Sequence, residues 1–288
     1  MPTSLTTPDG LVLRVHEWPV PNARGCVLIV HGLGEHIGRY AAIAAQLNAS
    51  GWHVVGFDQR GHGRSDGPRG RIEFHDALLR DLGQAVHAVR GEHPGPLVLL
   101  GHSLGGLIAA RFVAEGLQPQ PAAWHVSIDA LVLSSPALEV GTNAAQKLLL
   151  AVLGRLAPNL AVNNGLKPAW LSHDAAVVAA YLADPLVHDR ITPRLARFIV
   201  DEGAFVRRCA LQWRVPTLLM WAGRDRCVAP AGSAAFAAAA PAGVVDAQMF
   251  APLFHEIFNE PEKAQVFESL RVWLARSVSA TAGSALRA

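Results

Sequence analysis

The sequence has no long uninterrupted run of apolar residues. Its best candidate, residues 148–153, is broken by Gly154 and Arg155, so we expect no membrane-spanning helix. The first eight residues lack the basic and apolar regions of a secretory signal. Cysteine is scarce, and the three residues present cannot all pair and are not spaced as metal ligands: Cys26, Cys209 and Cys227. These absences favour a reduced, cytoplasmic compartment.

The chain also lacks an excess of either charge. Its formal net charge is +2 over 288 residues, and the arginines are scattered without a basic run, so we expect no nucleic-acid partner. Charged residues make up 17% and hydrophobic residues 51% of the chain, a balance that is typical of a globular protein. At this length the chain can bury a sizeable core, as one large domain or as a core with a smaller subdomain.

Apolar runs of strand length alternate with helical patterns through the first half of the chain. Residues 26–30 have the composition of a strand buried on both faces, and residues 52–57, 97–100 and 128–133 are further strand-like runs. Ahead of them, the turn signal Asp9-Gly10 predicts an antiparallel pair that opens the fold. This alternation predicts an α/β protein with a mostly parallel, doubly wound sheet. Its functional loops should lie at the carboxyl ends of the strands.

The alternation stops at residues 138–208, where we expect an inserted helical cap. This stretch has helical patches separated by prolines and no strand-like run. Two roles are compatible with its apolar patch: packing against the core, or a lid that lines an acyl-chain pocket or rests on lipid. The patch is too apolar for a solvated helix and comprises Leu148, Leu149, Leu150, Val152, Leu153, Leu156 and Leu160.

The remaining residues, 1–137 and 209–276, are predicted to form the α/β core of the fold. Its second part has strand-like runs at residues 217–221 and 244–250, each followed by a helical pattern. The small and polar residues 277–288 are expected to form a frayed tail. We see no internal repeat.

Residues 101–106, Gly-His-Ser-Leu-Gly-Gly, have the pattern of a nucleophile elbow. An apolar run precedes them and apolar residues at helical spacing follow them. In a strand–turn–helix context, G-x-S-x-G presents a serine hydroxyl at the carboxyl end of the strand, here that of Ser103. The plain alternative is a glycine-rich turn that contains a serine by chance.

A serine hydroxyl needs a base and an acid, and chain order selects His255 and Asp225 for these roles. In this fold the acid and then the histidine follow the nucleophile. His255 is the one histidine after Asp225, and it comes just past the last predicted strand. Asp246 lies too early in that strand to reach the site, and Asp201 belongs to the cap. Four other histidines lie in loops at the same edge and are expected to shape them by hydrogen bonds: His31, His36, His62 and His102.

Acyl transfer also needs donors for the oxyanion, each worth about 3–4 kcal/mol. In this arrangement the donors are backbone N–H groups. One belongs to Leu104, the residue after the nucleophile, and the other to Leu33, in the glycine-rich loop after residues 26–30.

With these motifs the chain resembles the α/β-hydrolases. More narrowly, it is similar to their monoacylglycerol lipase and lysophospholipase branch, which is grouped with the serine aminopeptidase-type hydrolases. Residues 31–40, His-Gly-Leu-Gly-Glu-His-Ile-Gly-Arg-Tyr, carry the most branch-specific motif. The similarity covers nearly the whole chain outside the cap and the tail. Further matching segments are residues 58–65, 101–106, 134–138 and 223–225.

This resemblance implies the same triad and the same two oxyanion amides. It also implies that Arg39 lies near the polar head of the substrate, although a surface ion pair is the plain alternative. Phe258 stands where some lipases of this branch have a second histidine that helps to hold glycerol, which weakens the case for a monoacylglycerol preference. Cys227 is a thiol near the site, and we favour a role for it as a small buried residue.

The sequence therefore predicts a serine hydrolase that cleaves a small lipid or ester, with monoacylglycerol or lysophospholipid as the expected substrate. It should need no metal and no organic cofactor. The cap is a candidate for peripheral membrane contact, and the oligomeric state is left open. Other serine hydrolases remain alternatives: carbon–carbon bond hydrolases, peptidases and perhydrolases. A different class of alternative is a ligand-binding or signalling protein on a hydrolase scaffold.

Overall fold

An eight-stranded sheet forms the centre of the computed structural model, which describes residues 2–141 and 152–284. The strands lie in the order β1-β2-β4-β3-β5-β6-β9-β10. β1 and β2 pair antiparallel, as do β2 and β4, and all the other pairs are parallel. The predicted sheet and its opening antiparallel pair are confirmed. The strands are β1 (Ser4–Thr6), β2 (Val12–Trp18), β3 (Cys26–Val30), β4 (His53–Phe57), β5 (Leu97–His102), β6 (Ala130–Ser134), β9 (Thr217–Ala222) and β10 (Val245–Phe250).

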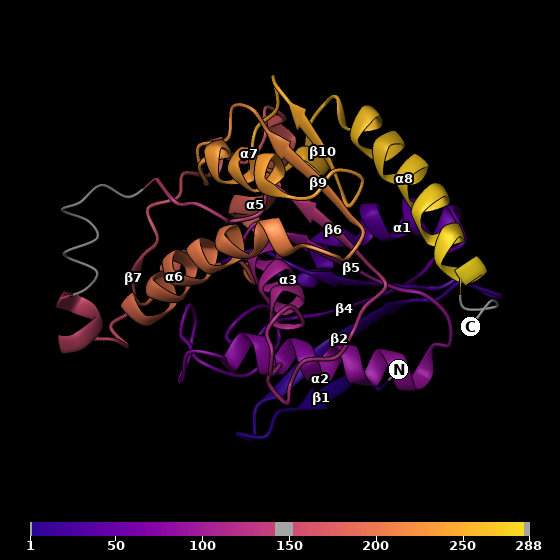
Figure 1. Cartoon of the computed structure of the whole chain (residues 1–288). Coiled ribbons are helices and arrows are strands. Elements are labelled where there is room, and N and C mark those ends of the chain that lie inside the picture. The colour runs from indigo at the N-terminus through magenta and orange to yellow at the C-terminus, as the bar shows by residue number, and fades with distance from the viewer. Residues whose placement is uncertain (1, 142–151, 285–288) are drawn as a thin grey trace.

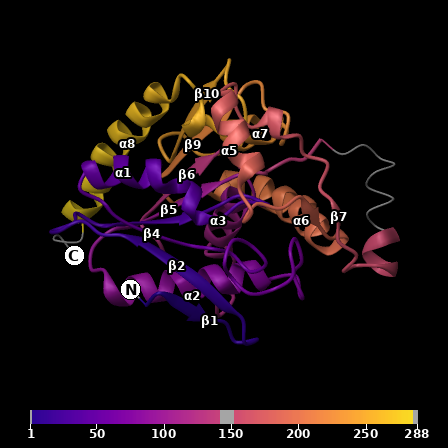
Figure 2. The ribbon, with the colours of Figure 1, turned by 180° about the vertical axis from the view of Figure 1, so that it is seen from behind.

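The central strands are apolar on both faces because helices cover both sides of the sheet. In β3 all five residues are buried; Val27 and Ile29 face one core cluster, and Leu28 and Val30 face the other. Each such side chain contributes roughly 1.5–3 kcal/mol by leaving water. Figures 1 and 2 show the two layers. One layer has α1 (Ala41–Ala49) and α8 (Lys263–Ser284), and the other has α2 (Ala77–Glu92), α3 (Leu104–Glu115), α6 (Pro193–Cys209) and α7 (Pro230–Ala239).

The segment between β6 and β9 contains more than helices. Besides the helices α5 (Ala175–Ala183) and α6, it has an antiparallel pair of two-residue strands, β7 (Val162–Asn163) and β8 (Arg190–Ile191). The prediction of a segment without strands was therefore wrong, because strands this short leave no pattern in the sequence.

The apolar patch predicted in this segment can be followed only in part. Residues 148–150 lie outside the described residues. The exposed fractions of Val152, Leu156 and Leu160 are 44%, 79% and 54%, so these three side chains do not pack against the core. Among the described residues, no helix is long and apolar enough to cross a membrane.

The last helix is longer than the sequence indicated. Helix α8 continues to Ser284, whereas we expected an irregular tail from residue 277. Small residues and serines are tolerated in a helix, so composition alone could not place its end. Residues 285–288 lie outside the described part of the chain.

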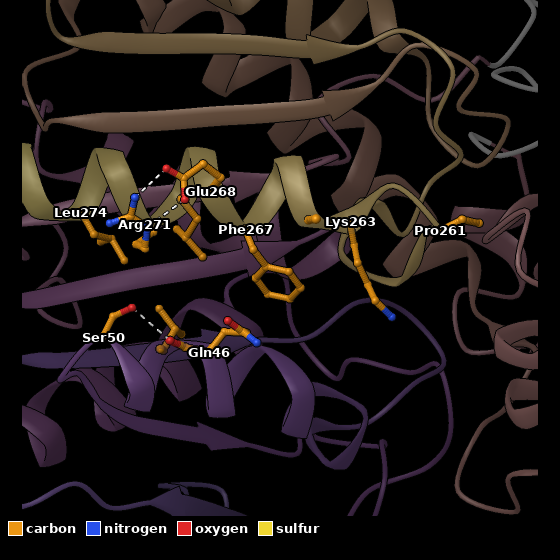
Figure 3. Close-up of a pocket in the computed structure, with 11 residues that line it drawn as sticks. Gln46, Ser50, Pro261, Lys263, Phe267, Glu268, Arg271 and Leu274 are labelled. Carbon is orange, nitrogen blue, oxygen red and sulfur yellow. Dashed lines mark hydrogen bonds and ion pairs between the residues drawn. The ribbon is translucent and has the colours of Figure 1, made fainter.

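A groove of about 440 Å³ lies between α1 and α8 (Figure 3). Phe267 and Leu274 of α8 face Gln46 of α1 across it, and the ion pair between Glu268 and Arg271 lies at its side. None of the predicted site residues lines this groove.

Candidate active site

Ser103 occupies a strained turn between β5 and α3. Its φ of 54° and ψ of −119° are unusual for a residue other than glycine. The glycines around it permit this turn: a Cβ at Gly101 would lie 2.4 Å from the Gly105 carbonyl oxygen, and one at Gly105 would lie 2.1 Å from that of Val30. The Ser103 N–H also donates to the Ser134 carbonyl at 3.0 Å. The sheet thus holds a conformation that costs roughly 1–3 kcal/mol, as nucleophile elbows do.

Asp225 and His255 are joined by a hydrogen bond of 2.7 Å between Nδ1 of the imidazole and Oδ2 of the carboxylate. Asp225 lies in the turn after β9, and its other oxygen accepts from the N–H groups of Cys227 at 2.8 Å and Val228 at 3.0 Å. His255 lies in the loop after β10. Because three donors hold the carboxylate, its direction toward the imidazole is set before any substrate binds.

The two side chains shift each other's pKa in opposite directions. Burial opposes the charged form of both groups. For Asp225, the charge and hydrogen bond of His255 and the two backbone donors outweigh burial, so its pKa is lowered. For His255, the charge and hydrogen bond of Asp225 outweigh burial, so its pKa is raised. The pair therefore stabilises an imidazolium opposite a carboxylate, which is what a general base needs after it has taken a proton.

The elbow and the Asp225–His255 pair meet at the carboxyl edge of the sheet. The ring of His102, next to Ser103 in the chain, lies 4.7 Å from the ring of His255, measured between centroids. Ser103 and Cys227 line the same cavity. The N–H of Cys227 donates a hydrogen bond to Asp225. The hydrogen bond from the Ser103 hydroxyl to His255 stays a prediction.

The two predicted oxyanion donors lie beside the nucleophile. Leu104 is the first residue of α3, and the first N–H groups of a helix have no partner within it. Leu33 lines the same cavity as Ser103. Its loop is tied down because the Gly32 N–H donates to Oε1 of Glu35 at 2.6 Å. The geometry keeps both residues as candidates for the oxyanion site.

An apolar cavity of about 240 Å³ opens above Ser103. The core contributes Leu33, Ser103, Leu104, Cys227 and Val228 to its lining. The segment between β6 and β9 lines the cavity with mainly aliphatic side chains: Ala137, Val140, Asn164, Leu166, Ile191, Ala196, Ile199 and Val200. Such a cavity can hold a hydrocarbon chain next to the hydroxyl.

Comparison with known proteins identifies the family. Residues 21–262 match the family described as serine aminopeptidase, S33. The chain belongs to this family.

Relatives of this serine aminopeptidase-type hydrolase include lipases, and the match covers nearly their whole length. A monoacylglycerol lipase from Mycolicibacterium smegmatis is 34% identical, over 92% of this chain and 93% of that protein. A phospholipase from Bacillus subtilis is 30% identical, over 89% and 97% respectively. The crystal structure of a monoacylglycerol lipase from Paleococcus ferrophilus has a TM-score of 0.80 and 35% identity, over 91% and 98%. The protein is a carboxylic ester hydrolase with the α/β-hydrolase fold.

Arg39 of this hydrolase is held by two carboxylates. It forms a bidentate pair with Glu256, with both N–O distances at 2.8 Å, and a further bond of 2.5 Å to Glu35. Burial would raise the pKa of Glu35, but the charge of Arg39 lowers it to about 2. Glu35 fixes the loop of Leu33, and Glu256 adjoins His255, so Arg39 connects the two loops. Its predicted contact with a substrate head group stays a prediction.

Glu35 and Glu256 were not among the predicted site residues. Glu35 stands within the motif at residues 31–40, and Glu256 directly follows the catalytic candidate His255. A charge-pairing search around Arg39 could have singled out Glu35 at i−4, but nothing in the sequence connects Arg39 with Glu256, 217 positions away.

The four histidines at this edge form hydrogen bonds as expected, three of them from loops, whereas His102 is the last residue of β5. Each is hydrogen-bonded to the backbone or to a carboxylate: His31 Nε2 with the Gln59 N–H at 3.0 Å, His36 with Asp184 at 2.8 Å, His62 with the Arg60 carbonyl at 2.9 Å, and His102 with the Ser134 carbonyl at 3.1 Å. Burial lowers the pKa of His102 to about 4, so it stays neutral beside His255.

Asp225, Cys227 and His255 also offer metal-ligating atoms within 4.8 Å of one another. The aspartate and histidine atoms are already bonded to each other, and burial raises the pKa of the Cys227 thiol. A metal ion here would have to displace the proton that joins the pair. We therefore assign it no part in the reaction.

Arg39→Met is expected to lower kcat by about 10- to 100-fold with little change in KM. The substitution leaves two buried carboxylates without their partner, and a shift of about 1 Å in either loop is enough for such a loss. Arg271→Met, which breaks an exposed ion pair with Glu268, serves as the control. Steady-state kinetics on one ester decide: a rise in KM at unchanged kcat would instead support the head-group contact.

Proposed function

We propose that this protein is a serine lipase that hydrolyses single-chain lipid esters, with monoacylglycerols as the preferred class. The observation that carries the proposal is the Asp225–His255 hydrogen bond of 2.7 Å beside an elbow serine that opens into an apolar cavity. The names of the relatives from Mycolicibacterium smegmatis and Paleococcus ferrophilus support the same substrate class.

In the proposed reaction, Ser103 attacks the ester carbonyl while His255 takes its proton. Asp225 keeps the imidazole in the tautomer whose Nε2 can accept that proton, and it stabilises the imidazolium that forms. The N–H groups of Leu33 and Leu104 bind the oxyanion of the tetrahedral intermediate. His255 then gives the proton to the leaving alcohol. A water activated by His255 hydrolyses the acyl-enzyme and frees the fatty acid.

The acyl chain is proposed to lie in the cavity above Ser103. Its aliphatic walls can cover a hydrocarbon chain but offer little to a peptide backbone, which disfavours peptidase activity. We propose that residues 138–208 act as the cap, because they supply most of the residues that line the cavity shared with Ser103. They also touch the histidine loop, since the Glu256 N–H donates to the Leu171 carbonyl at 2.8 Å.

The cap is also the proposed site of contact with a lipid surface. Leu156, Leu160 and Val162 are exposed by 79%, 54% and 42%, and all three lie in the cap. Exposed aliphatic side chains of this kind can partition into the lipid that holds the substrate.

The three cysteines are free thiols, which supports the proposed cytoplasmic location.

A substrate panel tests the proposal. Monoacylglycerols and lysophospholipids with the same acyl chain separate the two head-group classes, and a short nitrophenyl ester reports the chemistry alone. We expect the highest kcat/KM with monoacylglycerol. A higher value with lysophospholipid would favour the second candidate, which the phospholipase relative supports. Turnover of the nitrophenyl ester alone would contradict both lipid classes.

The rate is expected to rise with pH as His255 loses its proton. Burial alone would lower the pKa of His255, but Asp225 raises it above its usual 6.5. Because only the neutral imidazole can act as base, activity falls as the pH drops below this raised pKa. The acid limb of kcat/KM should therefore have its midpoint above pH 6.5. A midpoint in the range of an ordinary carboxyl group would contradict this assignment.

A further inference from the structure

Two histidines and a glutamate meet at the amino edge of the sheet, opposite the edge that carries Ser103. Glu17 lies on β2, His53 is the first residue of β4, and His93 directly follows α2. They come from three separate segments and take no part in the reaction proposed above. Their ligating atoms all lie within 4.8 Å of one another.

The distances are close to those of a metal site. Nε2 of His53 lies 2.8 Å from Oε1 of Glu17, and Nε2 of His93 lies 3.7 Å from the same oxygen. Ligand atoms around a tetrahedral zinc ion, with bonds of about 2.0–2.2 Å, are roughly 3.4 Å apart. Movements of less than about 1 Å would place the three atoms around one ion.

His93 has a buried ring nitrogen that has no hydrogen-bond partner among the described residues. Its Nε2 is shielded from solvent and has no hydrogen-bond partner there, since the Glu17 oxygen is too distant for one. Its ring packs against that of His53, with 4.1 Å between centroids. Buried polar nitrogens normally have a partner, and a bound cation would supply one.

The surroundings favour a ligand set of nitrogen and oxygen. Cys26 is the strand neighbour of His53 in β3. Its thiol is not among the group of ligating atoms that lie within 4.8 Å of one another. Two imidazoles and one carboxylate suit zinc and similar divalent transition metals, whereas magnesium prefers oxygen ligands alone.

We propose that Glu17, His53 and His93 bind one divalent transition-metal ion, with zinc as the best fit and water completing the coordination. The ion ties the ends of β2, β4 and α2 together at the edge of the sheet remote from catalysis. Its expected effect is on stability, because it binds the folded arrangement and not the dispersed residues of the unfolded chain.

Zinc titration of the chelator-treated protein tests the proposal. His93→Gln removes one ligand, and His87→Gln, on the exposed side of α2, is the matched control. Calorimetry should find one equivalent of zinc whose affinity falls more than about tenfold in His93→Gln and is unchanged in His87→Gln. Zinc should also raise the Tm of the wild type and of His87→Gln by several degrees, but not that of His93→Gln.

Two further measurements keep the result interpretable. The Tm of each variant without metal shows whether His93→Gln folds, and Glu17→Gln offers a second way to remove a ligand. Cobalt(II) in place of zinc should give the visible absorption of a tetrahedral site with nitrogen and oxygen ligands. Equal zinc affinity and equal Tm shift in the wild type and both ligand variants would overturn the proposal. Zinc that binds at Asp225, Cys227 and His255 alone would also overturn it.

Discussion

Ser103→Ala is expected to lower kcat by at least about 10⁴-fold on any ester that the wild type hydrolyses. Without the hydroxyl no acyl-enzyme can form, and only the oxyanion amides and substrate binding remain to accelerate attack by water. The fold should survive, because alanine removes one oxygen and leaves the backbone bond from residue 103 to the Ser134 carbonyl in place. Kinetics with the best ester of the panel and a thermal melt measure both effects.

Ser127→Ala is the matched control for this experiment. Ser127 is exposed and lies just before β6, at the opposite edge of the sheet. We expect its activity to equal that of the wild type within about twofold. Activity of Ser103→Ala within tenfold of the wild type would mean that another residue is the nucleophile.

Asp225→Asn is expected to lower kcat by about 10³- to 10⁴-fold. An amide at this position can present its N–H₂ group to Nδ1 of His255, which turns the imidazole into the tautomer that cannot accept the serine proton. The lost charge also removes the effect that raises the pKa of His255. Whatever activity remains should therefore have its acid limb at lower pH than the wild type, which a pH profile measures.

The rival acid provides the control for Asp225. Asp246 lies near the start of β10, where its Oδ2 accepts from Trp273 at 2.7 Å and from Arg276 at 2.8 Å. These bonds hold α8 against the sheet. Asp246→Asn is expected to change stability slightly and to leave kcat unchanged. A large loss of kcat in this variant would mean that Asp246, and not Asp225, is the catalytic acid.

Local patterns carried enough information to predict the sheet. β3 is apolar throughout and β5 is apolar up to Leu100, as suits strands whose two faces are both covered by helices. The elbow could be recognised because only glycine fits at positions 101 and 105, where a Cβ would meet backbone atoms. Chain order selected Asp225 and His255 as the candidates for acid and base, because this fold allows one order of the three residues. The structure joins these two side chains by a hydrogen bond.

Contacts between distant segments could not be predicted. The pair between Arg39 and Glu256, like the grouping of His93 with Glu17, depends on how loops and helix ends meet in space. Such contacts leave no periodic pattern, because they involve single residues at the ends of elements. The pair β7–β8 escaped for a similar reason, since two residues on each side show no alternation.

Together, the elbow, the Asp225–His255 pair and the Arg39 ion pairs describe a site arranged before substrate arrives. Each feature limits the motion of one part of the site. Ser103 has a strained backbone, the Asp225 carboxylate accepts three hydrogen bonds, and Arg39 is paired with two carboxylates. Such preorganisation lowers the reorganisation needed in the transition state. We propose that the cavity then selects substrates by their hydrocarbon part.

The central claim, that Ser103 is the nucleophile activated by His255, is tested most directly by covalent labelling. A fluorophosphonate reacts with a serine only when its hydroxyl is activated, and mass spectrometry of the digested protein locates the adduct. The account predicts one adduct per chain, on Ser103, formed far more slowly in Asp225→Asn. An adduct on another serine, or no adduct on the folded wild-type protein, would contradict it.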